Sequence, residues 1–146
     1  MNVVVVNRQK RRISRGGLGR LARAVMIAEG CEPRTELSVV IGDDKWIHHL
    51  NLEYRKRNVP TDVLAFPQER VAGVGPRLLG DVAISAETAA RQAKEMGHTL
   101  EEELAVLLIH GILHLTGWRD DTPGRRRRMM RRVEELLAQA RPGQLP

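Results

Sequence analysis

The 146-residue chain has little cysteine and few aromatic residues, and it contains no long apolar run. Its one cysteine, Cys31, cannot form an internal disulfide and has no second thiolate with which to hold a metal, as is typical of proteins from a reducing compartment. No apolar stretch approaches membrane-spanning length, and the short run from Val3 to Val6 is followed, not preceded, by basic residues. We therefore expect a cytoplasmic protein with neither a signal peptide nor a membrane anchor.

The scarcity of aromatic residues, 3% of the chain, means that the core must be built mainly from Val, Leu, Ile, Ala and Met. A chain of this length with 42% hydrophobic residues has the size of one domain, so a single domain over residues 1–146 is expected. Lys and Arg number 24 against 18 Asp and Glu, which gives a net charge of +6. This excess suits contact with a polyanion, although charge alone is weak support for it.

Hydrophobic periodicity predicts four strands and five helices, which together indicate an α/β (α+β) domain with a mixed β-sheet. Ser85 and Gly97 are suited to begin and end the third helix, and Thr99 with Glu102 makes a capping box for the fourth. A loop is expected between the third and fourth strands. The predicted strands cover residues 2–7, expected to be buried, and 35–41, 62–66 and 79–84; the helices cover residues 16–29, 43–54, 85–96, 99–116 and 123 onward, the last with Met129, Met130, Val133, Leu136 and Leu137 facing inward.

Two histidines, His110 and His114, lie four residues apart near the end of the most apolar predicted helix. This spacing places both imidazoles on one helix face, where they can reach one metal ion. An imidazole near a buried helix also needs a partner, so each should find either a hydrogen bond or a metal. Two core histidines with satisfied hydrogen bonds remain the alternative interpretation.

Gly117 and Asp120 follow His114 at intervals of three residues, which is the ligand spacing of the zinc motif His-Glu-x-x-His-x-x-Gly-x-x-His. The glycine lets the chain turn sharply out of the helix and bring a third ligand back toward the first two. Asp120 is the expected third ligand, with the neighbouring Asp121 as the alternative. Three protein ligands are typical of a catalytic zinc site.

Gly111 occupies the position at which zinc peptidases of this motif carry their general-base glutamate. A peptidase would therefore lack its proton shuttle, and metallopeptidase activity is the least favoured function. A bound metal could still lower the pKa of a water molecule, provided that other groups orient the substrate and stabilise negative charge.

The segment from His110 to Trp118 resembles the YbeY family of bacterial endoribonucleases, whose members carry His-Gly-x-Leu-His-Leu-x-Gly followed by an aromatic residue. Further blocks of that family occur in the same order over most of the chain. They comprise Leu50, Asn51, Tyr54 and Arg55, then residues 60–67, and then Gly80 and Asp81 leading into residues 82–85.

The resemblance implies a small domain, zincin-like around the metal helix, that cuts single-stranded RNA at a zinc ion in a basic cleft. It further implies a role in 3′-end maturation of 16S rRNA and in ribosome quality control, with the small ribosomal subunit as partner and no DNA or membrane partner. Arg55 occupies the family's functional arginine position and could hold a phosphate. Judged without the family, it is a surface arginine at a helix end.

At position 120 the family usually has histidine, so a site made of His110, His114 and Asp120 departs from the usual ligand set. The harder carboxylate ligand is also suited to divalent metals other than zinc.

The basic run from Arg125 to Arg132 could either contact RNA or form a solvated helix face. A ribosome assembly or RNA-binding factor with a structural metal site therefore remains the alternative function.

Overall fold

The computed structural model describes residues 1–68 and 77–140, and within them it contains four strands and five helices. Most of the expected loop between the third and fourth strands lies outside the described residues. In chain order the elements are β1 (Asn2–Asn7), α1 (Arg15–Ala28), β2 (Glu36–Gly42), α2 (Asp44–Arg55), β3 (Val63–Pro67), β4 (Leu78–Ser85), α3 (Ala86–Met96), α4 (Leu100–Leu115) and α5 (Pro123–Ala140). All nine predicted elements are confirmed, with ends that differ by at most two residues.

The four strands form one mixed sheet in the order β1-β2-β4-β3. β1 pairs with β2 and β2 with β4 in parallel, whereas β3 pairs with β4 antiparallel. β3 is consequently an edge strand, although it follows β2 in the sequence. This position matters for the site, because β3 lies beside α4.

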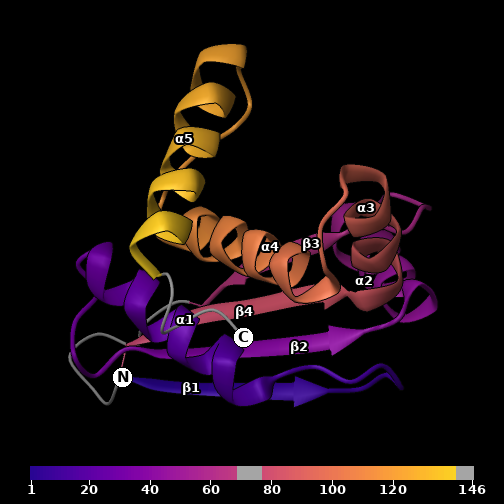
Figure 1. Cartoon of the computed structure of the whole chain (residues 1–146), viewed down its shortest axis with the longest axis horizontal. Helices are drawn as coiled ribbons and strands as arrows, with labels where there is room; N and C mark the ends of the chain where they lie inside the picture. The colour runs from indigo at the N-terminus through magenta and orange to yellow at the C-terminus, as the bar shows by residue number, and fades with distance from the viewer. Residues whose placement is uncertain (69–76, 141–146) are drawn as a thin grey trace.

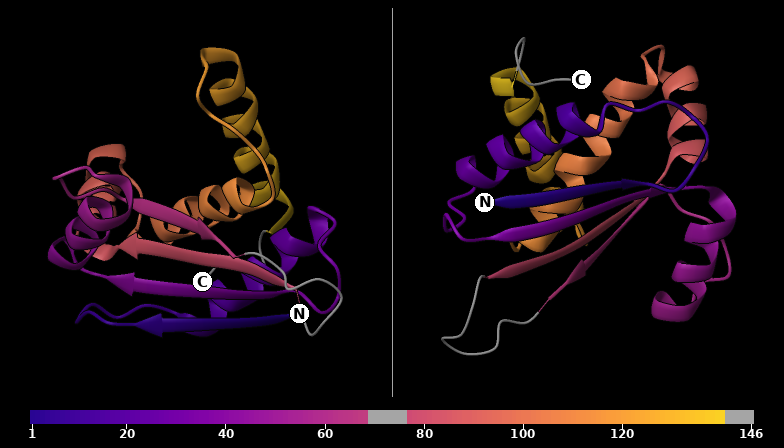
Figure 2. Two further views of the ribbon diagram at one scale, coloured as in Figure 1. Left: turned by 180° about the vertical axis from the view of Figure 1, so that it is seen from behind. Right: turned by 90° about the horizontal axis from the view of Figure 1, so that it is seen from below.

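The helices cover the two faces of the sheet unequally. α1 and α4 pack on one face, and their apolar residues form the main core with β2 and β4. α2 covers part of the opposite face, where Ile47, Leu64 and Ala83 form a smaller cluster. The views in Figure 2 show α1 and α2 on opposite sides of the sheet, and Figure 1 shows α5 extending away from it.

α4 is the central helix of the main core, and its sequence explains both its start and its burial. The expected capping box is present: Thr99 and Glu102 each accept a hydrogen bond from the other's backbone N–H at 3.1 Å. Leu104, Leu108 and Ile112 are almost wholly buried. Despite this apolarity, no helix in the described part of the chain is long and apolar enough to cross a membrane.

Two expectations about burial are wrong. β1 is an edge strand with one face uncovered, so Val4 and Val6 are 49% and 41% exposed and the strand is not buried. On α5, Met130 is 46% exposed, whereas Met129 and Val133 are buried as expected. Hydrophobic periodicity alone could not show that one face of β1 and the Met130 side of α5 are exposed, because their burial depends on how far the neighbouring layer of the fold extends.

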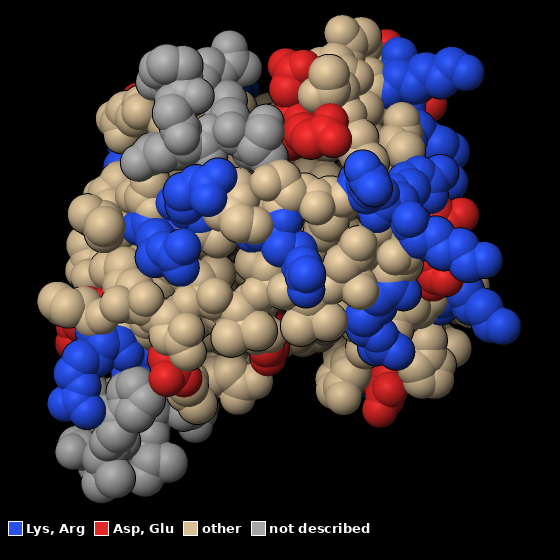
Figure 3. Space-filling model, turned by 60° about the horizontal axis from the view of Figure 1, so that its bottom comes forward, with Lys and Arg blue, Asp and Glu red and all other residues tan. Residues whose placement is uncertain are grey.

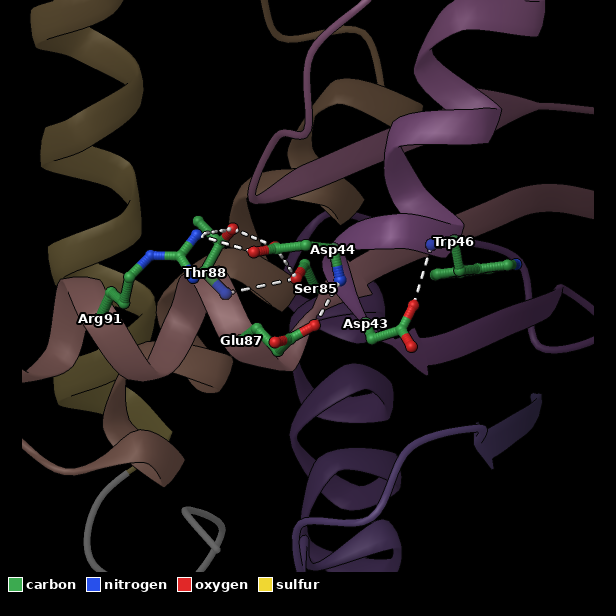
Figure 4. Close-up of polar contacts among 7 residues, drawn as sticks. All are labelled: Asp43, Asp44, Trp46, Ser85, Glu87, Thr88 and Arg91. Atoms are coloured by element: carbon green, nitrogen blue, oxygen red, sulfur yellow. Dashed lines mark hydrogen bonds and ion pairs between the residues drawn. The ribbon is translucent and has the colours of Figure 1, made fainter.

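Asp44 joins the start of α2 to the start of α3 (Figure 4). Its carboxylate accepts hydrogen bonds from Ser85 Oγ and Thr88 Oγ1, both at 2.6 Å, and from the Arg91 guanidinium at 2.8 Å. Partial burial raises the pKa of this carboxyl, but the hydrogen bonds from Ser85, Thr88 and Arg91 outweigh it and hold the pKa below its usual value. Asp44 is therefore ionised at neutral pH and fixes α2, the helix that carries Arg55.

Candidate metal centre

His110 and His114 project from the last two turns of α4 and face each other, as their spacing predicts. Their Nε2 atoms lie 3.0 Å apart, and their side chains are 26% and 31% exposed. Two imidazole lone pairs at this distance repel each other unless a proton or a cation lies between them. The pair is thus arranged as a chelating unit at the solvent-facing end of a buried helix.

The chain turns sharply after α4 because Gly117 adopts a φ of +104°, which a residue with a side chain rarely adopts. The backbone N–H of Gly117 donates to the carbonyl of His114, and that of Trp118 donates to the carbonyl of Leu113. These two bonds make a Schellman-type helix end. The turn brings the following residues back toward the histidines, so that Asp120 reaches them.

Asp120 completes a group of three candidate ligands with the two histidines. Its Oδ2 lies 3.4 Å from His114 Nε2 and 3.6 Å from His110 Nε2. Asp121, the alternative third ligand, is instead paired with Arg119 at 2.7 Å and Arg125 at 2.9 Å. The structure thus brings Asp120 to the histidines and engages Asp121 elsewhere.

The distances within this group suit a tetrahedral metal ion. Ligand atoms about 2.0–2.1 Å from zinc at tetrahedral angles lie about 3.3–3.4 Å from one another. The three observed separations are 3.0, 3.4 and 3.6 Å. Two imidazoles and a carboxylate are also a donor set that zinc accepts, so the residues present fit such an ion.

The electrostatics of the site keep His110 in the neutral form that binds metal. Burial lowers the pKa of His110 below its usual 6.5, and the neighbouring His114 lowers it further. The carboxylates of Asp120 and Asp62 act in the opposite direction but do not overcome these effects. His110 is therefore unprotonated at neutral pH.

Arg55 shares a cleft of about 250 Å³ with the two histidines. It lies at the end of α2, on the far side of the sheet from α4, and its guanidinium donates to the carbonyl of Ala65 in β3 at 3.1 Å. This bond uses one of the five N–H donors of the guanidinium. Arg55 is thus held at the edge strand beside the candidate metal ligands.

Gly111 lines the cleft where α4 packs closely on the sheet, and this close packing gives a physical reason for its identity. A Cβ added to it would lie 2.7 Å from Val82 Cγ1 and 3.1 Å from Val82 Cγ2. Such contacts are too short for α4 to stay where it is. A glutamate at this position, as in the zinc peptidases, could not be accommodated without moving the metal helix.

Glu29, which the sequence did not single out, holds the loop that carries Asp120. Its buried carboxylate accepts from Trp118 Nε1 at 2.6 Å and from Arg132 at 2.7 and 2.9 Å. Glu29 follows α1, Trp118 lies in the loop and Arg132 belongs to α5. No local pattern could have revealed it, because Glu29 and Trp118 are 89 residues apart.

We expect the Glu29→Gln variant to be less stable by about 1–3 kcal/mol, because it removes the buried one of the two carboxylates that pair with Arg132. The looser loop should also bind zinc roughly 10- to 100-fold more weakly. Urea unfolding and zinc titration against a competing chelator measure the two effects. The control is Glu135→Gln, which removes the exposed partner of the same Arg132 and should change either quantity little.

The remaining expected candidates lie apart from one another. His48 contacts Asn58 and His49 contacts Glu53, so these histidines form no joint site. Within the basic run, Arg125 and Arg132 form ion pairs with Asp121, Glu29 and Glu135. The exposed arginines of α5 with no ion pair found in the described residues are Arg126, Arg127, Arg128 and Arg131.

Fold and site together define a class of protein: a single small domain with a mixed four-stranded sheet and a candidate metal centre at the sheet edge. The central helix supplies two histidines to this centre, and the loop after the helix supplies one carboxylate. The comparisons with known proteins agree with this class. The family model described as endoribonuclease YbeY matches residues 4–141. The chain therefore belongs to the endoribonuclease YbeY family.

Relatives of this description match nearly the whole chain. One from Aquifex aeolicus is 44% identical over 136 residues, which are 93% of this chain and 89% of the relative. One from Geobacter metallireducens is 41% identical over 143 residues, which are 94% and 95% of the two chains. The solution structure of TM1509 from Thermotoga maritima shares the fold, with a TM-score of 0.60 and 24% identity over 95% of this chain and 91% of that one.

Proposed function

We propose that this protein is a metal-dependent endoribonuclease that cuts single-stranded RNA, with zinc held by His110, His114 and Asp120. The observation that carries the proposal is that these three candidate ligands and Arg55 meet at one cleft in a member of the endoribonuclease YbeY family. Zinc in such a site lowers the pKa of a bound water and polarises a phosphoryl oxygen. Other divalent ions suit the carboxylate ligand as well.

The chain's own residues would orient the phosphodiester. Arg55, fixed by the carbonyl of Ala65, offers its remaining N–H donors to the phosphate oxygens and stabilises the negative charge that builds during cleavage. The net charge of +6 favours the approach of a polyanion. Gly111 leaves no general base on α4 beside His110, so the arrangement does not support peptide hydrolysis.

We propose further that the physiological substrate is 16S rRNA at its 3′ end, within the small ribosomal subunit in the cytoplasm, and that the protein acts in ribosome quality control. Exposed arginines of α5 such as Arg126, Arg127 and Arg131 offer a basic surface for rRNA. Cells depleted of the protein should accumulate 16S rRNA with an unprocessed 3′ end. Normal 3′ ends in such cells would exclude this role.

The Arg55→Ala variant should cleave single-stranded RNA roughly 100- to 1,000-fold more slowly, because it loses the donor that stabilises charge in the transition state. Its zinc affinity should match that of the parent, because Arg55 is not among the candidate ligands. Single-turnover cleavage and zinc titration separate the two properties. Arg57→Ala, which removes an exposed charge two residues away, is the control.

Two results would count against the proposed function. One is intact single-stranded RNA after incubation with the purified, metal-loaded protein. The other is an Asp120→Ala variant that binds zinc as tightly as the parent, since this carboxylate would then not be a ligand.

A further inference from the structure

Three of the chain's four aromatic residues line one groove, which lies on the sheet face opposite α4. The groove has a volume of about 410 Å³, within the range of small-molecule sites, and runs between α2 and strands β3 and β4. Trp46 and Tyr54 come from α2, and Phe66 comes from β3. In a chain so poor in aromatic residues, this grouping needs an explanation.

Packing explains Trp46 and Phe66 but not Tyr54. Trp46 and Phe66 pack on the small core of Ile47, Leu64 and Ala83. Tyr54 is 60% exposed, and its ring meets that of Phe66 edge to face, with centroids 5.4 Å apart and an interplanar angle of 63°. A largely exposed aromatic side chain thus lies beside an apolar wall, and an exposed aromatic ring is a group on which a nucleobase can stack.

The lining of the groove includes hydrogen-bonding groups suited to the edge of a base. Asp81 lies directly opposite Phe66 in the antiparallel β3–β4 pair, so both side chains share one face of the sheet. Its carboxylate accepts a hydrogen bond from Gln68 Nε2 at 2.9 Å. A carboxylate accepts from the amino and imino groups of bases and repels phosphate, so it favours entry of the base with the backbone outside.

The groove and the candidate metal cleft are lined by neighbouring residues of α2 and of the edge strand β3. Tyr54 precedes Arg55 at the end of α2, so the groove and the cleft receive neighbouring residues of the same helix. Phe66 lies between Ala65 and Pro67, which both line the cleft. The end of α2 and strand β3 thus contribute side chains both to the cleft that Arg55 lines and to the groove that Tyr54 lines.

Basic residues lie at the other end of the groove. The guanidinium of Arg8 lies 5.5 Å from the centroid of the Trp46 ring. Arg8 begins the connection from β1 to α1, and Figure 3 shows Lys and Arg side chains gathered over this part of the molecule. The exposed cations here are Arg8, Lys10, Arg11, Arg12 and Arg15, which complement the charge of a nucleic acid backbone leaving the groove.

We propose that this groove binds a nucleobase of the RNA strand next to the phosphate held by Arg55, with Tyr54 as the stacking residue and Asp81 and Gln68 at the base edge. The inference rests on the proposed function for the identity of the ligand. It supplies a physical reason for single-strand selection: only an unpaired base can turn out of its strand, pass around the edge of β3 and stack in the groove.

The test measures binding and not cleavage, so that it is independent of catalysis. Fluorescence anisotropy compares a short, nuclease-resistant 2′-O-methyl single strand of mixed sequence with a strand of the same backbone that lacks bases. The strand with bases should bind the protein roughly tenfold more tightly. Tyr54→Ala should remove most of this difference, whereas Tyr54→Phe, which keeps the ring, should retain it.

The matched control is Leu52→Ala, which removes another exposed apolar side chain of α2 that does not line the groove, and it should leave binding unchanged. Equal binding of the two strands, or unchanged binding by Tyr54→Ala, would overturn the inference. So would a change of oligomeric state in Tyr54→Ala without a change in binding, because the groove would then serve a second copy of the chain. If the protein binds the strand with bases more tightly but cuts no RNA, the result would support the nucleobase site and reject the proposed endoribonuclease activity.

Discussion

The His114→Ala variant should bind zinc more than roughly 100-fold more weakly than the parent. Loss of a residue that only hydrogen-bonds to a metal ligand already lowers metal affinity by about 10- to 100-fold, and loss of the ligand itself should cost more. Cleavage of single-stranded RNA should fall to background at the same time. Competition with a chelator measures affinity, and an assay on a labelled single strand measures cleavage. His49→Ala, which removes a histidine that is 74% exposed and pairs with Glu53, is the control and should change neither.

The stability of the same variant separates a catalytic metal site from a structural one. His114 is partly exposed, and the buried residues of α4 such as Leu108 and Ile112 hold that helix in the core. The metal-free variant should therefore remain folded, with cooperative unfolding and the helix content of the parent. Loss of fold would favour the alternative in which the metal is structural and the protein is an RNA-binding assembly factor.

Zinc affinity should also depend on pH with a defined sign. His110 binds metal only when neutral, and burial together with His114 holds its pKa below 6.5. Protons on His110 therefore compete with the metal mainly in acid, so the contribution of His110 to affinity should change little near neutrality and decline in acid. An affinity that already falls between pH 8 and 7 would contradict this assignment of His110.

The Gly111→Ala variant should lose about 1–3 kcal/mol of unfolding free energy, because the added methyl group collides with Val82 and forces α4 away from the sheet. Movement of α4 also displaces His110 and His114, so zinc affinity should fall with stability. Thermal or urea unfolding and zinc titration provide the two measurements. Gly111→Glu should fail to fold, because it adds a carboxylate in the same place.

Gly19→Ala is the matched control for this prediction, since Gly19 is also buried within a helix. A Cβ there would meet only the end of the Arg23 side chain, at 3.6 Å, which is ordinary contact. Alanine is the better helix former, so this variant should be neutral or more stable by up to about 1 kcal/mol. Equal destabilisation of both variants would show that loss of glycine in a helix, and not the contact with Val82, causes the effect.

Local signals in the sequence were sufficient for the elements and for the centre of the site. Ser85 and Gly97 mark the ends of α3, and Thr99 with Glu102 marks the start of α4, because helix caps depend on residues within one turn of each other. The pair His110 and His114 is equally local, since one helical turn determines its geometry. Gly117 predicted the turn that returns the chain, and its positive φ confirms it.

Contacts that depend on the path of a loop or on the packing of distant segments were not predictable in this way. The sequence left Asp120 and Asp121 as alternatives, and only the folded loop brings Asp120 to the histidines while Arg119 and Arg125 engage Asp121. Likewise, the absence of glutamate at Gly111 was visible in the sequence, but its cause, the closeness of Val82, was not. Burial of β1 and Met130 was wrongly predicted because periodicity does not tell which face a neighbouring layer covers.

The sequence by itself thus determined the chemistry that one helix can display: two imidazoles on one face, a glycine turn after them and a carboxylate within reach. The tertiary structure alone decided what surrounds that helix, namely the carboxylate of Glu29 behind the loop, Arg55 at the edge of β3, and the aromatic groove beyond it. The physical reason is the separation in sequence over which each kind of interaction acts. Helix geometry relates residues three or four positions apart, whereas strand order and layer packing bring together residues that no local rule connects.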